Sequence, residues 1–208
     1  MSTNMPVELF TDGSALKNPG PSGLGYVIRY YENTGDNQMP VQKDLEGNQG
    51  FRLSTNNRME IMAGIFGLRR IFEEIDKGTL QGTAQINLSS DSEYFVNAVN
   101  KHWIDKWQQH NWMTSPWQGK PGHAVSNKDL WEQFIECQNE VKKRGINLTM
   151  THVNGHSGLE LNERADRLAV AASSDSSNHK IDEEYEKTSP YLNRSSSFSN
   201  YKPGNYNG

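Results

Sequence analysis

The first third of the chain alternates short apolar segments with turns. Residues 7–11 and 23–31 are rich in apolar side chains and predict two strands, with a turn at residues 18–21 (Asn-Pro-Gly-Pro) between them. Residues 33–50 are polar and rich in Gly and Asn, so we expect a long hairpin loop there, followed by a third strand near residues 51–53. The chain therefore begins with strands that turns connect.

The spacing of apolar residues then becomes helical. An apolar residue recurs every three or four positions at Ile61, Ile65, Leu68, Phe72 and Ile75, which predicts an amphipathic helix. Further strands are expected at residues 85–89 and 146–150, and further helices at residues 130–141 and 161–172. Hairpin strands followed by alternating helices and strands predict an α/β fold, with a five-stranded mixed sheet flanked by helices.

The composition changes near residue 173. Residues 173–208 contain nine serines and five asparagines, and their apolar residues follow no sustained period. Such a segment buries too little surface to offset the entropy of ordering. We therefore predict a folded domain at residues 1–172 and a disordered tail at residues 173–208, transiently helical at residues 181–191. The tail is interpreted as a solvated extension, with a peptide for an unknown partner as the alternative.

Overall composition limits the classes of protein that the chain can belong to. The 208 residues contain 21 Lys and Arg against 25 Asp and Glu, so nucleic-acid binding would need a local basic patch rather than bulk charge. No apolar run approaches the roughly 18–20 residues that span a bilayer, and no secretory signal is visible, so we expect no membrane association. The single cysteine, Cys137, fits a reducing cytoplasm. Without a heptad pattern, a monomer is expected.

Four acidic residues lie at strand ends or near helix starts, where an α/β sheet gathers its functional groups. They are Asp12, Glu60, Asp91 and Asp166. Taken singly, each of them is better explained as a helix cap or a solvated acid than as a functional residue. If they converge, their mutual repulsion calls for a bound cation, and an all-oxygen ligand set favours Mg²⁺ or Mn²⁺. Two such ions about 3.5–4 Å apart can clamp a phosphodiester.

Six short motifs occur in an order and spacing that identify a family. They are Phe10-Thr11-Asp12-Gly13-Ser14, Asn18-Pro19-Gly20-Pro21, Thr55-Asn56-Asn57-Arg58-Met59-Glu60, Ser90-Asp91-Ser92, Val153-Asn154-Gly155-His156-Ser157-Gly158 and Asn162-Glu163-Arg164-Ala165-Asp166. Together they resemble type 1 ribonuclease H, most closely the bacterial form, from about residue 6 to residue 172. The family cleaves the RNA strand of RNA–DNA hybrids, leaving 5′-phosphate and 3′-hydroxyl ends.

The resemblance implies a role for each matching residue. The four acids match the family's metal-binding carboxylates, and Asp12 is expected to bridge two Mg²⁺ ions. His156 matches a histidine in a mobile loop that assists proton movement or product release; a loop histidine without a function is the alternative. The resemblance therefore makes Asp12, Glu60, Asp91, His156 and Asp166 the expected catalytic residues.

The resemblance also implies contacts to both strands of the hybrid. Asn18, Asn56 and Asn57 match positions that contact RNA 2′-hydroxyls, although Asn is also favoured in turns and caps. Thr55 matches a threonine in a pocket for a DNA-strand phosphate. Family members often carry a basic residue seven positions before the glutamate, where this chain has Leu53. The pocket is therefore weakened or the strand register differs.

Residues 101–128 form a basic and aromatic stretch. They contain four lysines, one acid and four of the five tryptophans. The stretch resembles the family's basic protrusion, which implies that Trp107, Trp112, Lys106 and Lys120 contact the DNA strand. The alternative places the aromatic rings in the core, and we favour it for Trp103 and Trp131. Fewer lysines than in familiar bacterial members predict weaker hybrid binding.

Two other functions remain open from the sequence. One is a hybrid-binding module without catalysis, which would have no use for a repulsive acid cluster. The other is a related polynucleotidyl transferase of the same fold, such as an integrase or resolvase, which the motif at residues 55–60 and the basic aromatic stretch disfavour.

Overall fold

The computed structural model describes residues 5–32, 39–116 and 120–189. In chain order, these residues form β1 (Val7–Ala15), β2 (Gly20–Glu32), β3 (Val41–Ser54), α1 (Asn56–Asp76), β4 (Gln85–Ser90), α2 (Glu93–Asn100), α3 (Trp103–Gln109), α4 (Lys128–Lys143), β5 (Asn147–His152), α5 (Glu160–Ser174), the 3₁₀ turn η1 (Ser176–Asn178) and α6 (Glu183–Thr188). None of the helices in this described part combines the length and apolar character that crossing a bilayer requires.

The five strands form one mixed sheet in the order β3-β2-β1-β4-β5. The first three strands pair antiparallel, whereas β4 and β5 run parallel to β1. This arrangement confirms the predicted five-stranded mixed sheet. Because β1, β4 and β5 run in the same direction, their carboxyl ends lie at the same edge of the sheet.

The predicted hairpin loop at residues 33–50 is wrong for residues 41–50, which belong to β3. This strand pairs with β2 from Val41 to Ser54, and it forms the edge of the sheet. Six of its fourteen residues are exposed and only three are buried, so its sequence is polar and shows no apolar alternation. Residues 33–38 lie outside the described part of the chain.

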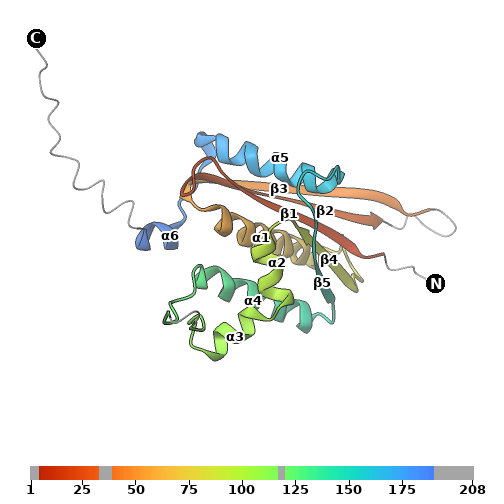
Figure 1. Ribbon diagram of the computed structural model, residues 1–208. Helices are drawn as coiled ribbons and strands as arrows, with labels where there is room; N and C mark the ends of the chain where they lie inside the picture. Colours follow the sequence, from red (N-terminus) through yellow and green to blue (C-terminus); the bar gives the residue numbers. More distant parts are fainter. Residues whose placement is uncertain (1–4, 33–38, 117–119, 190–208) are drawn as a thin grey trace, which may run out of the picture.

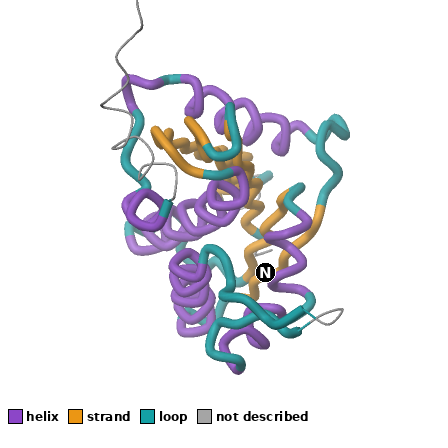
Figure 2. Tube along the Cα trace, turned by 60° about the vertical axis from the view of Figure 1, so that its left-hand side comes forward, coloured by secondary structure: helices purple, strands orange, loops and turns teal. Residues whose placement is uncertain are grey.

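The helices cover both faces of the sheet (Figures 1 and 2). Helix α5 packs on β1, β2 and β3, while α1, α2 and α4 lie on the other side. The larger core is on the side of α1, and Trp131, Phe95 and Phe134 are fully buried within it. The core position predicted for Trp131 is thus confirmed, whereas Trp103 is only partly buried.

The expected disordered tail is wrong for residues 173–189. Helix α5 extends to Ser174, Lys180 pairs with β3 beside Gly50 and Arg52, and α6 follows within the stretch that was expected to be helical. Acidic side chains of this segment form ion pairs with Arg52 and Arg58. Ion pairs between distant residues leave no periodic apolar signal, so composition alone did not reveal this packing. Residues 190–208 lie outside the described residues.

Candidate active site

Two of the four acids are placed by neighbouring parallel strands. Thr11 of β1 pairs with Ser90 of β4, so Asp12 and Asp91, the next residues, lie side by side at the edge of the sheet. Asp91 does not cap a helix, because the Ser92 hydroxyl accepts the hydrogen bond from the Phe95 backbone N–H at 3.3 Å. The carboxylate of Asp91 is therefore available to the site.

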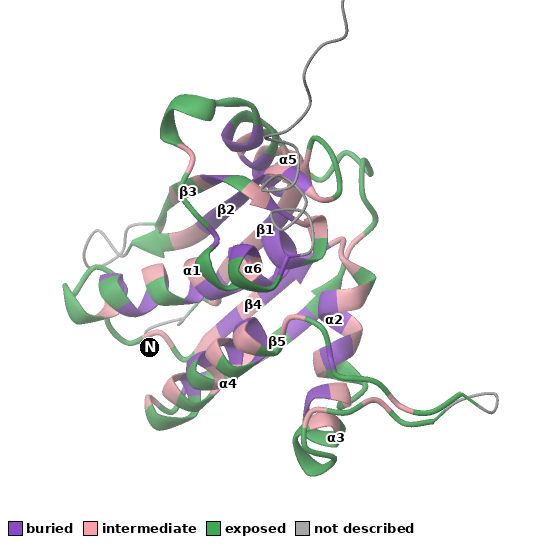
Figure 3. Ribbon diagram, turned by 90° about the vertical axis from the view of Figure 1, so that its left-hand side faces the viewer, coloured by how far each residue is buried: buried purple, intermediate pink, exposed green. Residues whose placement is uncertain are grey.

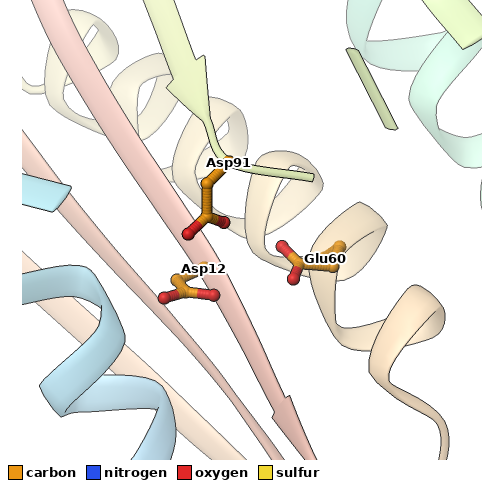
Figure 4. Close-up of side chains that lie close together, drawn as sticks. All are labelled: Asp12, Glu60 and Asp91. Carbon is orange, nitrogen blue, oxygen red and sulfur yellow. The ribbon is translucent and has the colours of Figure 1, made fainter. Parts of the chain in front are cut away.

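Helix α1 brings Glu60 to the same place. Thr55 caps this helix, and its hydroxyl accepts a hydrogen bond from the Arg58 backbone N–H at 3.4 Å. A Cβ atom on Gly13 would lie 2.5 Å from the backbone nitrogen of Glu60, so the glycine permits β1 and α1 to approach closely. Ligand oxygens of Asp12, Glu60 and Asp91 consequently lie within 4.8 Å of one another (Figure 4).

Asp166 reaches the site from α5 on the other face of the sheet. A cavity of about 290 Å³ is lined by Asp12, Gly13, Asn56, Glu60, Asp91, His156, Asn162, Glu163 and Asp166. The structure therefore brings all four predicted acids, the predicted histidine and Asn56 to one cavity. Asp166 lines this cavity without belonging to the tighter three-residue cluster.

The electrostatics of the site disfavour negative charge when no cation is bound. Burial, followed by repulsion from Asp91 and Asp166, raises the pKa of Asp12 from 3.8 to about 8, although the Gly13 backbone N–H donates to its Oδ1 at 2.6 Å. Burial, with repulsion from Asp12 and Asp91, also raises the pKa of Glu60 well above its ordinary value. Such a cluster is stabilised by a positive ligand.

The orphaned oxygens of the cavity fit a metal ion. Glu60 Oε1 accepts a hydrogen bond from the Asn56 amide at 3.2 Å, but the buried Oε2 has no hydrogen-bond partner among the described residues. The buried Asn162 Oδ1 likewise has none in that part of the chain. Buried oxygens without partners are costly unless a ligand satisfies them, and an all-oxygen set suits a hard divalent cation. The donor set therefore fits Mg²⁺ or Mn²⁺.

The loop after β5 carries His156 to the edge of the cavity. His156 is exposed and has a positive φ of 52°, and Gly158 nearby has a φ of 80°. A Cβ atom on Gly155 would lie 2.9 Å from Asp91 Oδ2, so this loop passes directly beside the carboxylate. His152 instead contacts the backbone carbonyl oxygen of Asp91 through its Nε2 at 3.1 Å, which is a structural contact.

Three of the predicted substrate-binding residues line a second cavity, of about 700 Å³. Asn18, Thr55 and Asn57 lie in its wall, together with residues of α4 and α6. Asn18 also supports the fold, because its Oδ1 accepts a hydrogen bond from the Asn56 backbone N–H at 3.2 Å. Asn18 and Thr55 thus both support the start of α1 and line this cavity.

The basic aromatic stretch forms α3 and the segment that follows it. The Trp107 ring packs against Trp131 at 5.6 Å and is partly buried, and Lys128 Nζ lies 5.8 Å from the ring centroid of Trp112. Lys106 and Lys120 are exposed. Trp107 therefore covers the core with part of its surface. Trp117, which the sequence placed in the same stretch, lies outside the described residues.

Besides Gly13, two cavity residues with polar side chains were missed by the sequence reasoning. Asn162 and Glu163 lie on α5 within the same motif as Asp166, and both line the cavity. Asn162 precedes Asp166 by four positions, a spacing that places both on one face of a helix. That spacing could have identified Asn162.

Comparison with known proteins identifies the family. The RNase H family model matches residues 4–174. Ribonuclease H of Idiomarina loihiensis is 40% identical over 169 residues, which cover 81% of this chain and 88% of that protein, and ribonuclease H of Aeromonas salmonicida is 42% identical over 168 residues, which cover 81% and 90%.

Solved structures agree with the sequence relatives. LC9-RNase H1, a type 1 RNase H with the type 2 active-site motif, is 27% identical with a TM-score of 0.61, covering 94% of this chain and 87% of that chain. LC11-RNase H1 in complex with RNA/DNA hybrid is 25% identical with a TM-score of 0.52, covering 80% and 95%. With its acids gathered at one sheet edge and these relatives along most of its length, the chain belongs to the ribonuclease H family.

Proposed function

We propose that the protein is an endoribonuclease that hydrolyses the RNA strand of RNA–DNA hybrids and leaves 5′-phosphate and 3′-hydroxyl ends. The observation that carries this proposal is the meeting of Asp12, Glu60, Asp91 and Asp166 in one cavity of a ribonuclease H chain. A protein that only bound hybrids would gain nothing from four acids that repel one another, two of which, Asp12 and Glu60, are buried. This cost argues for catalysis over binding alone.

The four carboxylates are proposed to hold two Mg²⁺ ions, or Mn²⁺, when the hybrid is bound. The bound ions would activate the attacking water and neutralise the charge that develops on the phosphate oxygens. Asp12 and Glu60 are held by β1 and α1, so their oxygens are oriented before substrate arrives. Burial of both residues keeps bulk water away from their oxygens.

His156 is proposed to assist proton movement or product release. In the overall reaction, the water oxygen forms a bond to phosphorus, the bond from phosphorus to the 3′-oxygen breaks, and a proton ends on that 3′-oxygen. An exposed histidine at the cavity edge can exchange a proton with solvent between turnovers. Its position on a loop allows it to move while the carboxylates stay fixed.

The remaining predicted contacts are proposed to distinguish the two strands. Asn18, Asn56 and Asn57 are proposed to meet the RNA 2′-hydroxyls, which DNA lacks. Thr55 is proposed to meet a phosphate of the DNA strand in the 700 Å³ cavity. The DNA strand is proposed to be bound farther along the hybrid by the exposed Lys106 and Lys120 and the partly buried Trp107 and Trp112. None of these four residues lines either of the two cavities.

A cleavage assay with three labelled duplexes tests this function. RNA–DNA hybrid, duplex DNA and duplex RNA are each incubated with the protein in Mg²⁺ or in EDTA. We expect loss of the RNA strand of the hybrid only, and only with Mg²⁺. A hybrid that is bound but stays intact would favour the non-catalytic module, and cleavage of duplex DNA would favour the transferase.

Substitution of one acid tests the assignment of the site. Asp12→Asn should abolish cleavage while leaving folding and hybrid binding largely intact, because the acids act as a unit. Glu136→Gln, which removes an exposed acid on α4, is the matched control and should cleave like the wild type. An Asp12→Asn variant that still cuts the hybrid would remove Asp12 from the mechanism.

A further inference from the structure

The 700 Å³ cavity proposed to receive a DNA-strand phosphate has a wall that the chain's own C-terminal segment supplies. Glu184, Tyr185 and Thr188 of α6 line it together with Thr55 and Asn57 of the α1 start. Figure 3 shows α6 close to the beginning of α1. A segment that follows the fold in sequence therefore borders the place where the substrate is proposed to bind.

The basic groups of this cavity are neutralised by carboxylates of the chain itself. The Arg58 guanidinium donates to Asp129 at 2.6 and 2.8 Å and to Asp182 at 2.7 and 2.9 Å. Lys128 Nζ lies 3.5 Å from the Glu132 carboxylate. Both cations of the lining are thus already paired with acids. A phosphate entering the cavity would meet cations whose charge is already balanced.

Helix α6 extends this neutralisation to the neighbouring strand. Glu186 accepts hydrogen bonds from Arg52 at 2.8 and 2.5 Å. Arg52 is the basic residue next to Leu53, the position at which the family often has a basic residue. Residues 182–186 therefore contribute one carboxylate to Arg58, which lines the cavity, and one to Arg52, which precedes Leu53 on β3. Of these residues only Glu184 and Tyr185 line the cavity, and Glu184 places its negative charge in the wall.

We propose that α6 is an autoinhibitory segment whose carboxylates compete with a DNA-strand phosphate of the hybrid for this cavity. The inference rests on the proposed function. The helix spans six residues, and a helix this short depends on its tertiary contacts rather than on its own stability. The phosphate therefore competes with a small number of ion pairs, and charge removed from the cavity side of α6 strengthens hybrid binding.

The chain offers a matched pair of substitutions for the test. Glu183 and Glu184 are adjacent on α6, and their carboxylates lie 3.9 and 3.6 Å from the same partner, Lys187 Nζ. Only Glu184 lines the cavity, whereas the Glu183 side chain is 79% exposed. Glu184→Gln and Glu183→Gln thus remove the same charge from the same helix and differ in whether that charge faces the cavity.

Hybrid binding is measured by fluorescence anisotropy in EDTA over a range of NaCl concentrations, and KM and kcat are measured with Mg²⁺. We expect Glu184→Gln to lower Kd and KM at low salt by about two- to fivefold, as for a single exposed charge, with kcat unchanged. Glu183→Gln should change neither constant. If both variants bind alike, or if Glu184→Gln binds more weakly, the inference is wrong.

Glu186→Gln provides a second measurement, because it releases Arg52. This variant should also lower Kd, and it should steepen the slope of log Kd against log salt by up to about 0.9 per added phosphate contact. An unchanged slope and an unchanged Kd would contradict the inference. If the Glu186→Gln variant fails to fold, the binding constants of Glu184→Gln test the inference by themselves. That variant should fold, because the Glu184 side chain is 53% exposed and is not required for packing.

The two proposals fail in distinguishable ways. A wild-type protein that does not cut the hybrid in Mg²⁺ overturns the proposed function, whereas the binding comparison in EDTA does not depend on cleavage. A protein that cuts the hybrid, but whose Glu184→Gln variant matches Glu183→Gln in Kd and KM, retains the proposed function and overturns the role of α6.

Discussion

Replacing Asp182 with Asn measures how strongly the segment after α5 is anchored to the fold. Asp182 is 3% exposed, and its carboxylate accepts two hydrogen bonds from Arg58 and one from the Ser54 hydroxyl at 2.6 Å. Burial lowers the pKa of Arg58, but the hydrogen bonds that its guanidinium donates to Asp129 and Asp182 outweigh burial and raise that pKa. Asn keeps the shape of the side chain and one oxygen, but it removes the charge that balances a buried guanidinium.

The size of the effect follows from what Arg58 retains. Removal of one member of a buried ion pair usually costs about 3–5 kcal/mol, because the other charge stays buried without compensation. Arg58 keeps two hydrogen bonds to Asp129, so we expect a loss of about 2–3 kcal/mol in the free energy of unfolding. For a chain of this size the corresponding decrease in Tm is about 5–10 °C.

Urea denaturation followed by circular dichroism measures this loss. Asp175→Asn is the control, because Asp175 caps the 3₁₀ turn η1, is exposed, and Asn caps as well as Asp does. The control should stay within about 0.5 kcal/mol of the wild type. An Asp182→Asn variant that is as stable as the control would show that the segment is not anchored by this pair, and the reasoning would be refuted.

Three further predictions concern the active site and the basic stretch. In EDTA, the free energy of unfolding should fall by about 1 kcal/mol or more as the pH rises from about 4 to about 8, because the folded state keeps a proton on Asp12 that the unfolded state releases. Urea denaturation at several pH values in this range measures the fall, and a flat profile would contradict the prediction. The Asp12→Asn variant should show a weaker fall. Gly13→Ala should cost about 1–3 kcal/mol and lower kcat, since its Cβ would lie 2.5 Å from the backbone nitrogen of Glu60; a variant with unchanged Tm and kcat would rule this out. Lys106→Ala should reduce the salt slope of hybrid binding by about 0.9, and an unchanged slope would place Lys106 outside the interface.

The elements with strong local signals could be predicted from the sequence. The three- and four-residue spacing of apolar side chains gave α1, because that helix buries one face against the sheet. The acids Asp12 and Asp91 could be located as well, because they directly follow the last residues that pair β1 with β4. The sequence could not show that the four acids share a cavity, because separation along the chain does not determine distance in space. Only the folded structure shows this.

The failures have a common physical cause. Strand β3 is polar because only three of its fourteen residues are buried, and its order comes from backbone pairing with β2. Residues 173–189 are polar because ion pairs and hydrogen bonds, rather than a continuous apolar face, attach them to the domain. In both segments the stabilising contacts are backbone hydrogen bonds to another strand or side-chain contacts to residues far away in the sequence. The pattern of side chains along the chain does not reveal such contacts.

The location of the bound cation is the most direct test of the central claim that Asp12, Glu60, Asp91 and Asp166 form one metal site. Crystals of the protein grown with Mn²⁺, measured near the manganese absorption edge, report that location through anomalous scattering. We predict a peak in the 290 Å³ cavity, about 2–2.5 Å from oxygens of Asp12 and of at least one other of these acids. A protein that cleaves the hybrid in Mn²⁺ but shows no peak in this cavity would contradict the account.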